Sequence, residues 1–277
     1  MLIDSFEAGK IVKAFQEGKE SVKVKLDLGF RKKEIFFKKD DILINNKFYP
    51  VETMKKLVKD HGIYDLNDEI TKIAFFDQHY YKLEPIEGTA PTLEIDGIRM
   101  HRTKHMTPLE DAQRKISYIR LSEGEDVLDI CTGLGYTAIH SYRKKANVTT
   151  IEKDPNVIKI AKKNPFSDEL FEGISNKDIK FILDDATQVA KTFENESFDV
   201  ILHDPPRFSL AGELYSGNFY EELFRILRKN GRLLHYVGSP GSKYRGKDFV
   251  KGVQNRLKNA GFRTKKTPDG ESVLAFK

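Results

Sequence analysis

The chain of 277 residues has one cysteine and no apolar run that approaches the length of a membrane span. A single cysteine cannot close a disulfide within the chain, and the seven scattered histidines form no zinc-ligand pattern. No charged stretch followed by an apolar one opens the sequence, as it would in a secretory signal peptide. We therefore expect a protein of the cytoplasm with no metal site.

Charge is abundant but nearly balanced, since the chain is 32% charged and has a net charge of +5. With 39% hydrophobic residues, this composition is typical of a soluble protein with one large domain, or a main domain and a smaller one. Positive charge is concentrated between Lys243 and Lys266, where Asp248 is the only acid. Such a run indicates either a solvated helix face or a surface that attracts a polyanion such as RNA.

The first hundred residues have the pattern of a small, mostly β module. Alternating apolar and charged residues from Val22 to Leu28 predict a half-buried strand, and Asn45-Asn46 and Asp96-Gly97 are typical of hairpin turns. Residues 84–91, with two prolines and a glycine, have the composition of a linker. The expected helices are Ser5–Glu17 and Val51–His61, and the further strands are Glu34–Lys38, Asp41–Ile44, Ile70–Phe76, His79–Leu83, Thr92–Ile95 and Ile98–His101.

From Thr107 onward, apolar strands alternate with helical patterns, which predicts a parallel sheet covered by helices on both faces. Thr107 and Pro108 suit the start of a helix that runs to about Arg120. We therefore expect a domain of residues 1–100 and an α/β domain of residues 101–277. The expected strands are Asp126–Ile130, Asn147–Glu152, Ile179–Leu183, Phe198–His203, Arg232–Val237 and Ser272–Phe276, and the helices between them are Tyr136–Lys144, Asn156–Lys163, Thr187–Thr192, Ser216–Leu227 and Gly246–Ala260.

The first strand of the α/β domain leads into a loop with two glycines, Gly133 and Gly135. Glycine tolerates positive φ and lets the backbone approach a ligand closely. Acids follow three successive strands, and open α/β sheets bind ligands at the carboxyl ends of their strands. Asp129 could take a positive amine, Glu152 the hydroxyls of a ribose, and Asp185 an adenine amino group. A nicotinamide dinucleotide fits less well, because the loop is one glycine short of G-x-G-x-x-G.

The fourth strand ends in Asp204-Pro205-Pro206, followed by Arg207 and Phe208. Neither proline has an N–H and each fixes its own φ, so the segment is stiff and its carbonyls lack strand partners. It is either a tight turn or a pocket in which a carboxylate and a rigid carbonyl hold an –NH₂ group. His203, the last residue of the strand, is either a core histidine or a proton acceptor.

From about Thr107 to Lys277 the chain resembles the class I S-adenosylmethionine-dependent methyltransferases, which implies a Rossmann-like fold with a mostly parallel seven-stranded sheet. The motif His-Asp-Pro-Pro-Arg-Phe-Ser is most similar to that of archaeal predicted methyltransferases, and rRNA cytidine N4-methyltransferases look similar at this point. The resemblance rests on four motifs in order: residues 129–135, Glu152, Asp184-Asp185-Ala186 and Asp204-Pro205-Pro206.

This resemblance implies S-adenosylmethionine as the cofactor. The glycine loop would pass under its methionine part, Glu152 would hold the ribose and Asp185 the adenine. Cys131 stands where the family has its first glycine, and we expect a change of shape there without chemistry. The implied cofactor-binding residues are Asp129, Cys131, Thr132, Gly133, Gly135, Glu152, Asp184, Asp185, Ala186 and Asp204.

The resemblance also implies methylation of an exocyclic amine. Asp204, Pro205 and Pro206 would hold the amine, and Arg207 or Phe208 would stack on a flipped base. Cytosine C5 chemistry needs a cysteine nucleophile, and the only cysteine lies in the cofactor loop. Direct transfer to nitrogen needs only alignment and an acceptor for the proton or charge.

We therefore expect an enzyme that acts on RNA, with cytidine N4 in rRNA as the best single target and tRNA as another. The β module and the basic C-terminal stretch would hold the RNA. Three alternatives remain: a polyamine aminopropyltransferase-like enzyme, a protein glutamine methyltransferase, and a catalytically silent RNA-binding subunit with the same fold.

Overall fold

A computed structural model describes residues 1–238 and 249–277. The chain forms two compact units. The first comprises residues 1–109 and 159–166, and the second comprises residues 110–158 and 167–277. No helix in the described ranges is long and apolar enough to cross a membrane.

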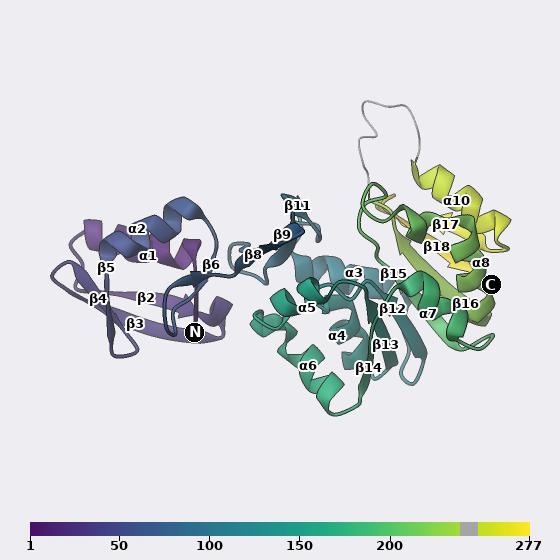
Figure 1. The fold of residues 1–277 in the computed structure, drawn as a ribbon, viewed down its shortest axis with the longest axis horizontal. Helices are drawn as coiled ribbons and strands as arrows, with labels where there is room; N and C mark the ends of the chain where they lie inside the picture. Colours follow the sequence, from purple (N-terminus) through teal and green to yellow (C-terminus); the bar gives the residue numbers. More distant parts are fainter. Residues whose placement is uncertain (239–248) are drawn as a thin grey trace. The chain divides into compact units, whose positions relative to one another are not determined.

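The first unit is built from short antiparallel strands in three sheets, ordered β1-β6-β7, β2-β3-β4-β5 and β11-β10-β9-β8. The two helices α1 and α2 lie on the same side of strands β2 and β3 (Figure 1). The bounds of its elements are β1 Leu2–Asp4, α1 Ser5–Gln16, β2 Ser21–Leu26, η1 Asp27–Gly29, β3 Arg31–Lys38, β4 Asp41–Ile44, β5 Lys47–Pro50, α2 Val51–Asp60, β6 Ile63–Asp65, β7 Thr71–Lys72, β8 Ala74–Asp77, β9 His79–Glu84, β10 Thr92–Ile95 and β11 Ile98–Arg99.

Most of the expected elements of this unit are present. Asn45 and Asn46 have φ of 48° and 62°, as the expected hairpin turn requires. The prediction of a linker at residues 84–91 is wrong. Glu84 belongs to β9 and pairs with Thr92 of β10, so the segment closes a hairpin within one sheet. Its prolines and glycine reflect the turn, because proline and glycine are common in both turns and linkers.

The second unit contains the expected α/β alternation. Its sheet has seven strands in the order β14-β13-β12-β15-β16-β18-β17, with β18 antiparallel to both of its neighbours. The bounds of the remaining elements of the chain are α3 Pro108–Ile119, β12 Asp126–Ile130, α4 Tyr136–Arg143, β13 Asn147–Glu152, α5 Pro155–Ala161, η2 Pro165–Ser167, α6 Asp168–Ser175, β14 Ile179–Leu183, α7 Ala186–Thr192, β15 Phe198–His203, η3 Gly212–Tyr215, α8 Gly217–Ile226, β16 Leu227–Tyr236, α10 Phe249–Asn259, β17 Arg263–Lys266 and β18 Ser272–Phe276.

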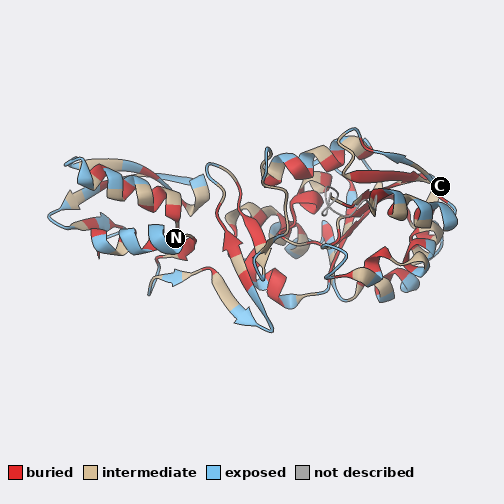
Figure 2. Cartoon of the chain, turned by 90° about the horizontal axis from the view of Figure 1, so that it is seen from above, coloured by how far each residue is buried: buried red, intermediate tan, exposed pale blue. Residues whose placement is uncertain are grey.

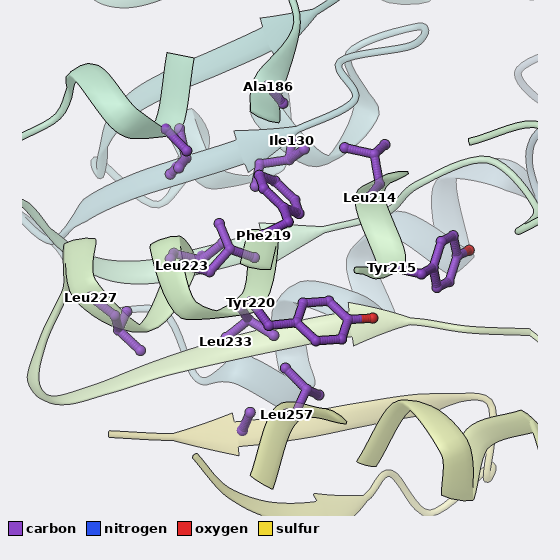
Figure 3. Packing of buried hydrophobic residues seen from close by; sticks show 14 of the residues in the cluster. Ile130, Ala186, Leu214, Tyr215, Phe219, Tyr220, Leu223, Leu227, Leu233 and Leu257 are labelled. Carbon is purple, nitrogen blue, oxygen red and sulfur yellow. The ribbon is translucent and has the colours of Figure 1, made fainter. Parts of the chain in front are cut away.

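This sheet is Rossmann-like and mostly parallel, as expected. Strands β12, β13 and β15 are buried along most of their length, and buried strands of the second unit are drawn in red in Figure 2. One apolar cluster joins the sheet to α7, α8 and α10, and another joins it to α3, α4 and α6. Figure 3 shows Phe219 and Leu223 of α8 gathered with Ile130 and Leu233 of the sheet. The helices thus fix the carboxyl ends of β12, β13, β14 and β15 along one edge.

Candidate functional site

The loop between β12 and α4 is held in a conformation that most residues avoid. Gly133 and Gly135 have φ of 56° and 81°, and a Cβ on Gly135 would lie 2.5 Å from Leu170 Cδ2. Cys131 also has a positive φ, 73°, which costs a non-glycine residue about 1–2 kcal/mol. Burial raises the pKa of its thiol well above the usual value, so it stays protonated. The loop is therefore a shaped backbone surface with little side-chain bulk.

Asp129 lies beneath this loop and is fully buried. Its carboxylate accepts hydrogen bonds from Thr137 Oγ1 at 2.8 Å and Thr150 Oγ1 at 2.7 Å. Thr150 Oγ1 also lies 2.6 Å from Thr132 Oγ1, so three hydroxyls and the carboxylate of Asp129 form one network under the loop. Burial raises the pKa of Asp129 to about 7. This arrangement braces β12, β13 and α4 against each other at the loop.

Glu152, at the end of β13, is joined to the glycine loop. One carboxylate oxygen accepts the N–H of Gly133 at 3.0 Å, and the other accepts those of Lys153 and Asp154 at 3.0 and 3.1 Å. Burial raises its pKa, and the Gly133 N–H opposes that rise. A carboxylate has about four acceptor positions, so three bonds leave capacity for a ligand hydroxyl.

Asp184, Asp185 and Ala186 follow β14, as the sequence placed them. Asp185 caps α7 by accepting from the N–H and the hydroxyl of Thr187, and its second oxygen lies 2.8 Å from Lys153 Nζ. Burial raises the pKa of Asp185, but the bonds to Lys153 and Thr187 outweigh that effect and lower it. Asp184 is exposed and accepts from the N–H of Asp185. Asp185 is thus an ionised carboxylate at the same edge as Glu152.

Asp204, directly after β15, is the carboxylate with the most unusual partner. Its Oδ2 lies 2.6 Å from Nζ of Lys115, a residue of α3 that is only 5% exposed. Lys115 Nζ also contacts Asp111 Oδ2 at 2.8 Å and lies 4.3 Å from the ring centre of Tyr236. Burial acts to lower the pKa of Lys115, but the two carboxylates raise it above its usual value. The ammonium is therefore charged, and with both carboxyls ionised the triad of Asp111, Lys115 and Asp204 has a formal net charge of −1.

The second oxygen of Asp204 remains available. Within residues 1–238 and 249–277, Asp204 Oδ1 makes no hydrogen bond, and neither does the carbonyl of Pro205. The carbonyl of Pro206 differs, because it accepts from Tyr215 Oη at 2.8 Å. Burial raises the pKa of Asp204, and the charge of Lys115 opposes the rise. The rigid segment thus presents two acceptors that receive no hydrogen bond from the described residues, and its far end is fixed by Tyr215.

The aromatic residue of the motif lies at the surface. Phe208 is 49% exposed, and its ring centre is 5.5 Å from that of Tyr215 and 5.6 Å from that of Phe249. Arg207 is also exposed. Both residues that the sequence offered for stacking are therefore exposed, within four residues of Asp204.

His203 lies in the core. It is 1% exposed, and its Nε2–H donates to the Leu214 carbonyl at 2.9 Å. Burial lowers its pKa to about 4, so the ring is neutral. His235 next to it donates from Nδ1 to the Tyr236 carbonyl and accepts at Nε2 from Tyr220. These histidines support the strands that carry the site.

Lys115 was not among the sequence candidates, although its position in α3 contains a signal. The residues Ala112, Ile116 and Ile119 form the buried stripe of this helix, and Lys115 falls on the same stripe. A charge at a core position calls for a buried partner. The partner, Asp204, is far away in sequence, and only the fold brings the two together.

The described part of the chain holds no group of three or more His, Cys, Asp or Glu that could bind a metal ion. Of the basic stretch, Lys243, Arg245, Lys247 and Asp248 lie outside the described residues. The remainder lies on α10 and β17, where Lys258, Arg263 and Lys265 are exposed.

Comparisons with known proteins agree with this architecture. Residues 121–259 match the family model "Methyltransferase domain". An uncharacterized protein of Methanocaldococcus jannaschii is 50% identical over 93% of this chain and 91% of its own. A polyamine aminopropyltransferase of Prochlorococcus marinus is 33% identical over 64% of this chain and 60% of its own. A crystal structure of spermidine synthase with a transition-state analogue has a TM-score of 0.58 at 19% identity, covering 77% of each chain.

Proposed function

Because the chain belongs to the methyltransferase domain family, with S-adenosylmethionine as its cofactor, we propose that it methylates an exocyclic amino nitrogen in RNA. The preferred target is N4 of a cytidine in ribosomal RNA. The cofactor supplies a methyl group on a positively charged sulfur. The residues of this chain hold the cofactor, present the amine and stabilise the charge that the nitrogen gains.

One observation in particular indicates that the site fits the cofactor. Gly133 ties the loop to Glu152 through its N–H, and a Cβ placed on Gly133 would approach only the carbonyl of Cys131, at 4.0 Å. The backbone at Gly133 thus leaves room for a ligand, and the buried Glu152 beside it has an acceptor position left for a ligand hydroxyl. Glu152 would take a ribose hydroxyl, and Asp185 would take the adenine amino group.

The observation that carries the proposal is a pair of acceptors, Asp204 Oδ1 and Pro205 O, that receive no hydrogen bond from any residue the structure describes. An –NH₂ group has two N–H donors, and two fixed acceptors orient its lone pair toward an incoming methyl group. Lys115 holds the other carboxylate oxygen, so the carboxylate cannot turn away. The segment is therefore suited to an amine or amide nitrogen and gives no advantage to a hydroxyl oxygen.

The charge of the triad favours the same reaction. Nitrogen becomes positive as the methyl group arrives, and two carboxylates with one ammonium leave a net negative charge beside it. Because these groups are already in place, they need not reorganise during transfer. Lys115 also counteracts the rise in the pKa of Asp204 that burial causes, which favours the ionised carboxylate.

RNA is favoured by what surrounds the two acceptors. Phe208 presents an accessible ring and Arg207 an accessible guanidinium, and either can stack on an unpaired base. Exposed basic residues on α10 and β17 of the same unit suit a phosphate backbone. An enzyme that methylates a protein glutamine would need neither feature.

Aminopropyl transfer to a polyamine is a second candidate, because the Prochlorococcus marinus relative is 33% identical. A polyamine is a polycation, and its site is expected to be lined by unpaired acids. Here the carboxylate that would receive the amine is already paired with a buried ammonium at 2.6 Å. That pairing favours a neutral amine.

The proposal is tested by mass spectrometry of nucleosides from rRNA and tRNA of a strain that lacks the gene. We expect loss of N4-methylated cytidine from rRNA, and its return when purified protein and S-adenosylmethionine are added. Parallel reactions contain putrescine with decarboxylated S-adenosylmethionine, or a glutamine-containing peptide. Group transfer in one of those reactions, with none to RNA, would show that the substrate is a polyamine or a protein glutamine and not RNA. Cofactor binding in calorimetry without transfer to any of them would indicate a silent RNA-binding subunit.

A further inference from the structure

The sheet β2-β3-β4-β5 of the first unit has one covered face and one open face. Val24, Leu26, Ile35, Ile42 and Ile44 point inward and pack with α1 and α2 in a single apolar cluster. Both helices lie on this side of the sheet (Figure 1). Because side chains alternate along a strand, the residues between them form the opposite face.

That opposite face, which we call the outer face, exposes large apolar side chains. Phe36 on β3 is 59% exposed, Leu43 on β4 is 39% exposed and Phe48 on β5 is 49% exposed. Leu43 pairs directly with Phe48, and Phe36 pairs with Ser21. Neighbouring strands lie about 4.8 Å apart, so the two rings are separated by roughly 10 Å across the sheet. Apolar side chains grouped in this way indicate an interaction surface.

The same face has an excess of positive charge. Lys25 on β2 is directly opposite Lys32 on β3, and like charges in that relation destabilise a sheet. Lys23, Lys25 and Lys32 are exposed, and none of them makes an ion pair within residues 1–238 and 249–277. Lys38 Nζ lies 5.3 Å from the ring centre of Phe48. An anion that bridges Lys25 and Lys32 would relieve their repulsion.

The acids of the outer face do not cancel this charge. Glu34 accepts a hydrogen bond from Ser21 Oγ at 2.8 Å, and Asp41 lies opposite Lys38. Four lysines therefore share the face with two acids, in alternation with two accessible phenylalanine rings. A protein partner with an apolar patch would gain nothing from the unpaired lysines, whereas a polyanion with flat apolar groups uses both features.

We propose that the outer face of β2–β5 binds a single-stranded segment of RNA, with bases stacked on Phe36 and Phe48 and phosphates on Lys23, Lys25, Lys32 and Lys38. A duplex hides the faces of its bases, so the rings select an unpaired strand. The inference rests on the proposed function only in its choice of RNA as the nucleic acid. It assigns to the first unit a site distinct from the place of methyl transfer.

The test measures fluorescence anisotropy of the full chain with a labelled 12-nucleotide polyuridine strand and with an RNA duplex of the same length. We expect the strand to bind more tightly than the duplex. The double change Phe36→Ala and Phe48→Ala should weaken binding of the strand by at least about tenfold. It should leave the dependence on salt unchanged, because no charge is removed.

The change of Lys25 and Lys32 to alanine has a different signature. Each lysine that contacts a phosphate contributes about 0.7 to the slope of log affinity against log salt for a single strand. We expect the slope to fall by about 1.4 in this double variant. The matched controls are Phe76→Ala, which removes a 74% exposed ring on β8, and Lys56→Ala, which removes an exposed lysine on α2. Neither should change affinity by more than about twofold.

Unchanged binding in both double variants would overturn the inference, as would stronger binding of the duplex. Light scattering that shows a dimer in the wild type and a monomer in the phenylalanine variant, with equal RNA affinity, would assign the face to a second copy of the chain. The two proposals fail separately. If the protein methylates RNA and the variants bind RNA as the wild type does, the RNA site on the outer face is refuted and the proposed function stands. Loss of binding in the variants, with no methyl transfer to any RNA, would refute the proposed function alone.

Discussion

The second unit and the outer face of the first unit use charge in opposite ways. In the second unit, Asp129, Glu152 and Asp204 are largely buried, and each is held by hydroxyls, backbone N–H groups or an ammonium of its own unit. On the outer face, Lys23, Lys25 and Lys32 are exposed and lack ion-pair partners within the described residues. The first arrangement suits a small ligand in a fixed position, and the second suits a flexible polymer.

This contrast also separates two kinds of electrostatic interaction, those of buried groups and those of exposed groups. Buried, oriented groups act strongly and over short distances, because they are shielded from water. Exposed lysines act weakly one by one and are screened by salt. Substitutions in the second unit should therefore change rates and cofactor affinity by large factors that depend little on salt. Those on the outer face should change RNA affinity in small, salt-dependent steps.

The largest effect is expected at Asp204. Asp204→Ala should lower the single-turnover rate of methyl transfer on the order of 10²–10³-fold, because it removes a preorganised acceptor that interacts most strongly in the transition state. Affinity for S-adenosylmethionine should stay within a few-fold, since Glu152 and Asp185 are untouched. Rapid-quench kinetics and calorimetry measure the two quantities on the same preparation.

Asp204→Asn is the matched variant. Its amide oxygen can still accept from the amine, so partial activity should remain if the role of Asp204 is to position the amine. If Asp204→Ala transfers methyl groups at the wild-type rate, the acid and its two prolines are only a turn.

The next largest effect is expected at Glu152. Glu152→Ala should weaken S-adenosylmethionine binding about 10- to 150-fold, because it removes charge-assisted hydrogen bonds to the ribose and the support of Gly133. Calorimetry measures this directly. Glu34→Ala, an exposed acid on the outer face, is the control and should bind the cofactor as the wild type does. Equal affinity in both variants would contradict the assignment of Glu152.

Substitution of Lys115 or Asp111, the other members of the triad, should have a smaller effect, and the direction of the pH shift should differ between them. Lys115→Met removes the charge that holds down the pKa of Asp204, whereas Asp111→Asn removes one that raises it. The acidic limb of the rate against pH should therefore move to higher pH in Lys115→Met and to lower pH in Asp111→Asn. The rate on the plateau should fall on the order of tenfold in Lys115→Met, as for the loss of one charge-assisted hydrogen bond.

A buried triad that loses its ammonium keeps two unpaired carboxyls, so Lys115→Met can also unfold the protein. Circular dichroism separates that outcome from a kinetic one, and Asp111→Asn tests the same idea without loss of the ammonium. Limbs that move in the same direction in both folded variants would show that Asp204 is not the titrating group.

The sequence predicted the second unit better than the first. Strands β12, β13, β14, β15 and β18 begin and end at the expected residues, because short apolar-rich segments that alternate with helical patterns predict the strands of a parallel sheet. Helix α6 and strand β17 were missed. Three acids and a glycine interrupt the apolar stripe of α6, and β17 is the edge strand Arg263–Lys266, whose residues are almost all basic.

The same reasoning explains what could be predicted of the sites. The acids after successive strands were found because the order of strands alone brings them to one edge. Lys115 was not, because its role depends on how α3 packs beside β15. The outer face was not predicted either. Phe36 and Phe48 become a pair only when the register of β3, β4 and β5 is known.

The smallest effect is expected in stability, and it compares a buried histidine with an exposed one. The pKa of His203 in the folded protein is about 4, below its usual value of 6.5, because burial disfavours the charged ring. The unfolded chain therefore binds more protons than the folded one between these values, and stability falls as pH falls through that range. From pH 7.5 to 5.5 this residue alone should cost about 1 kcal/mol of unfolding free energy.

His203→Gln, which can still donate to Leu214, should lose this part of the pH dependence in thermal unfolding, a difference of about 2 °C in the shift of Tm. His105→Gln, which changes an exposed histidine, is the matched control for the substitution itself. If His203→Gln and the wild type lose stability equally between these pH values, the ring of His203 is not held neutral by burial, and the strand end beside Asp204 is more open to water than the structure shows.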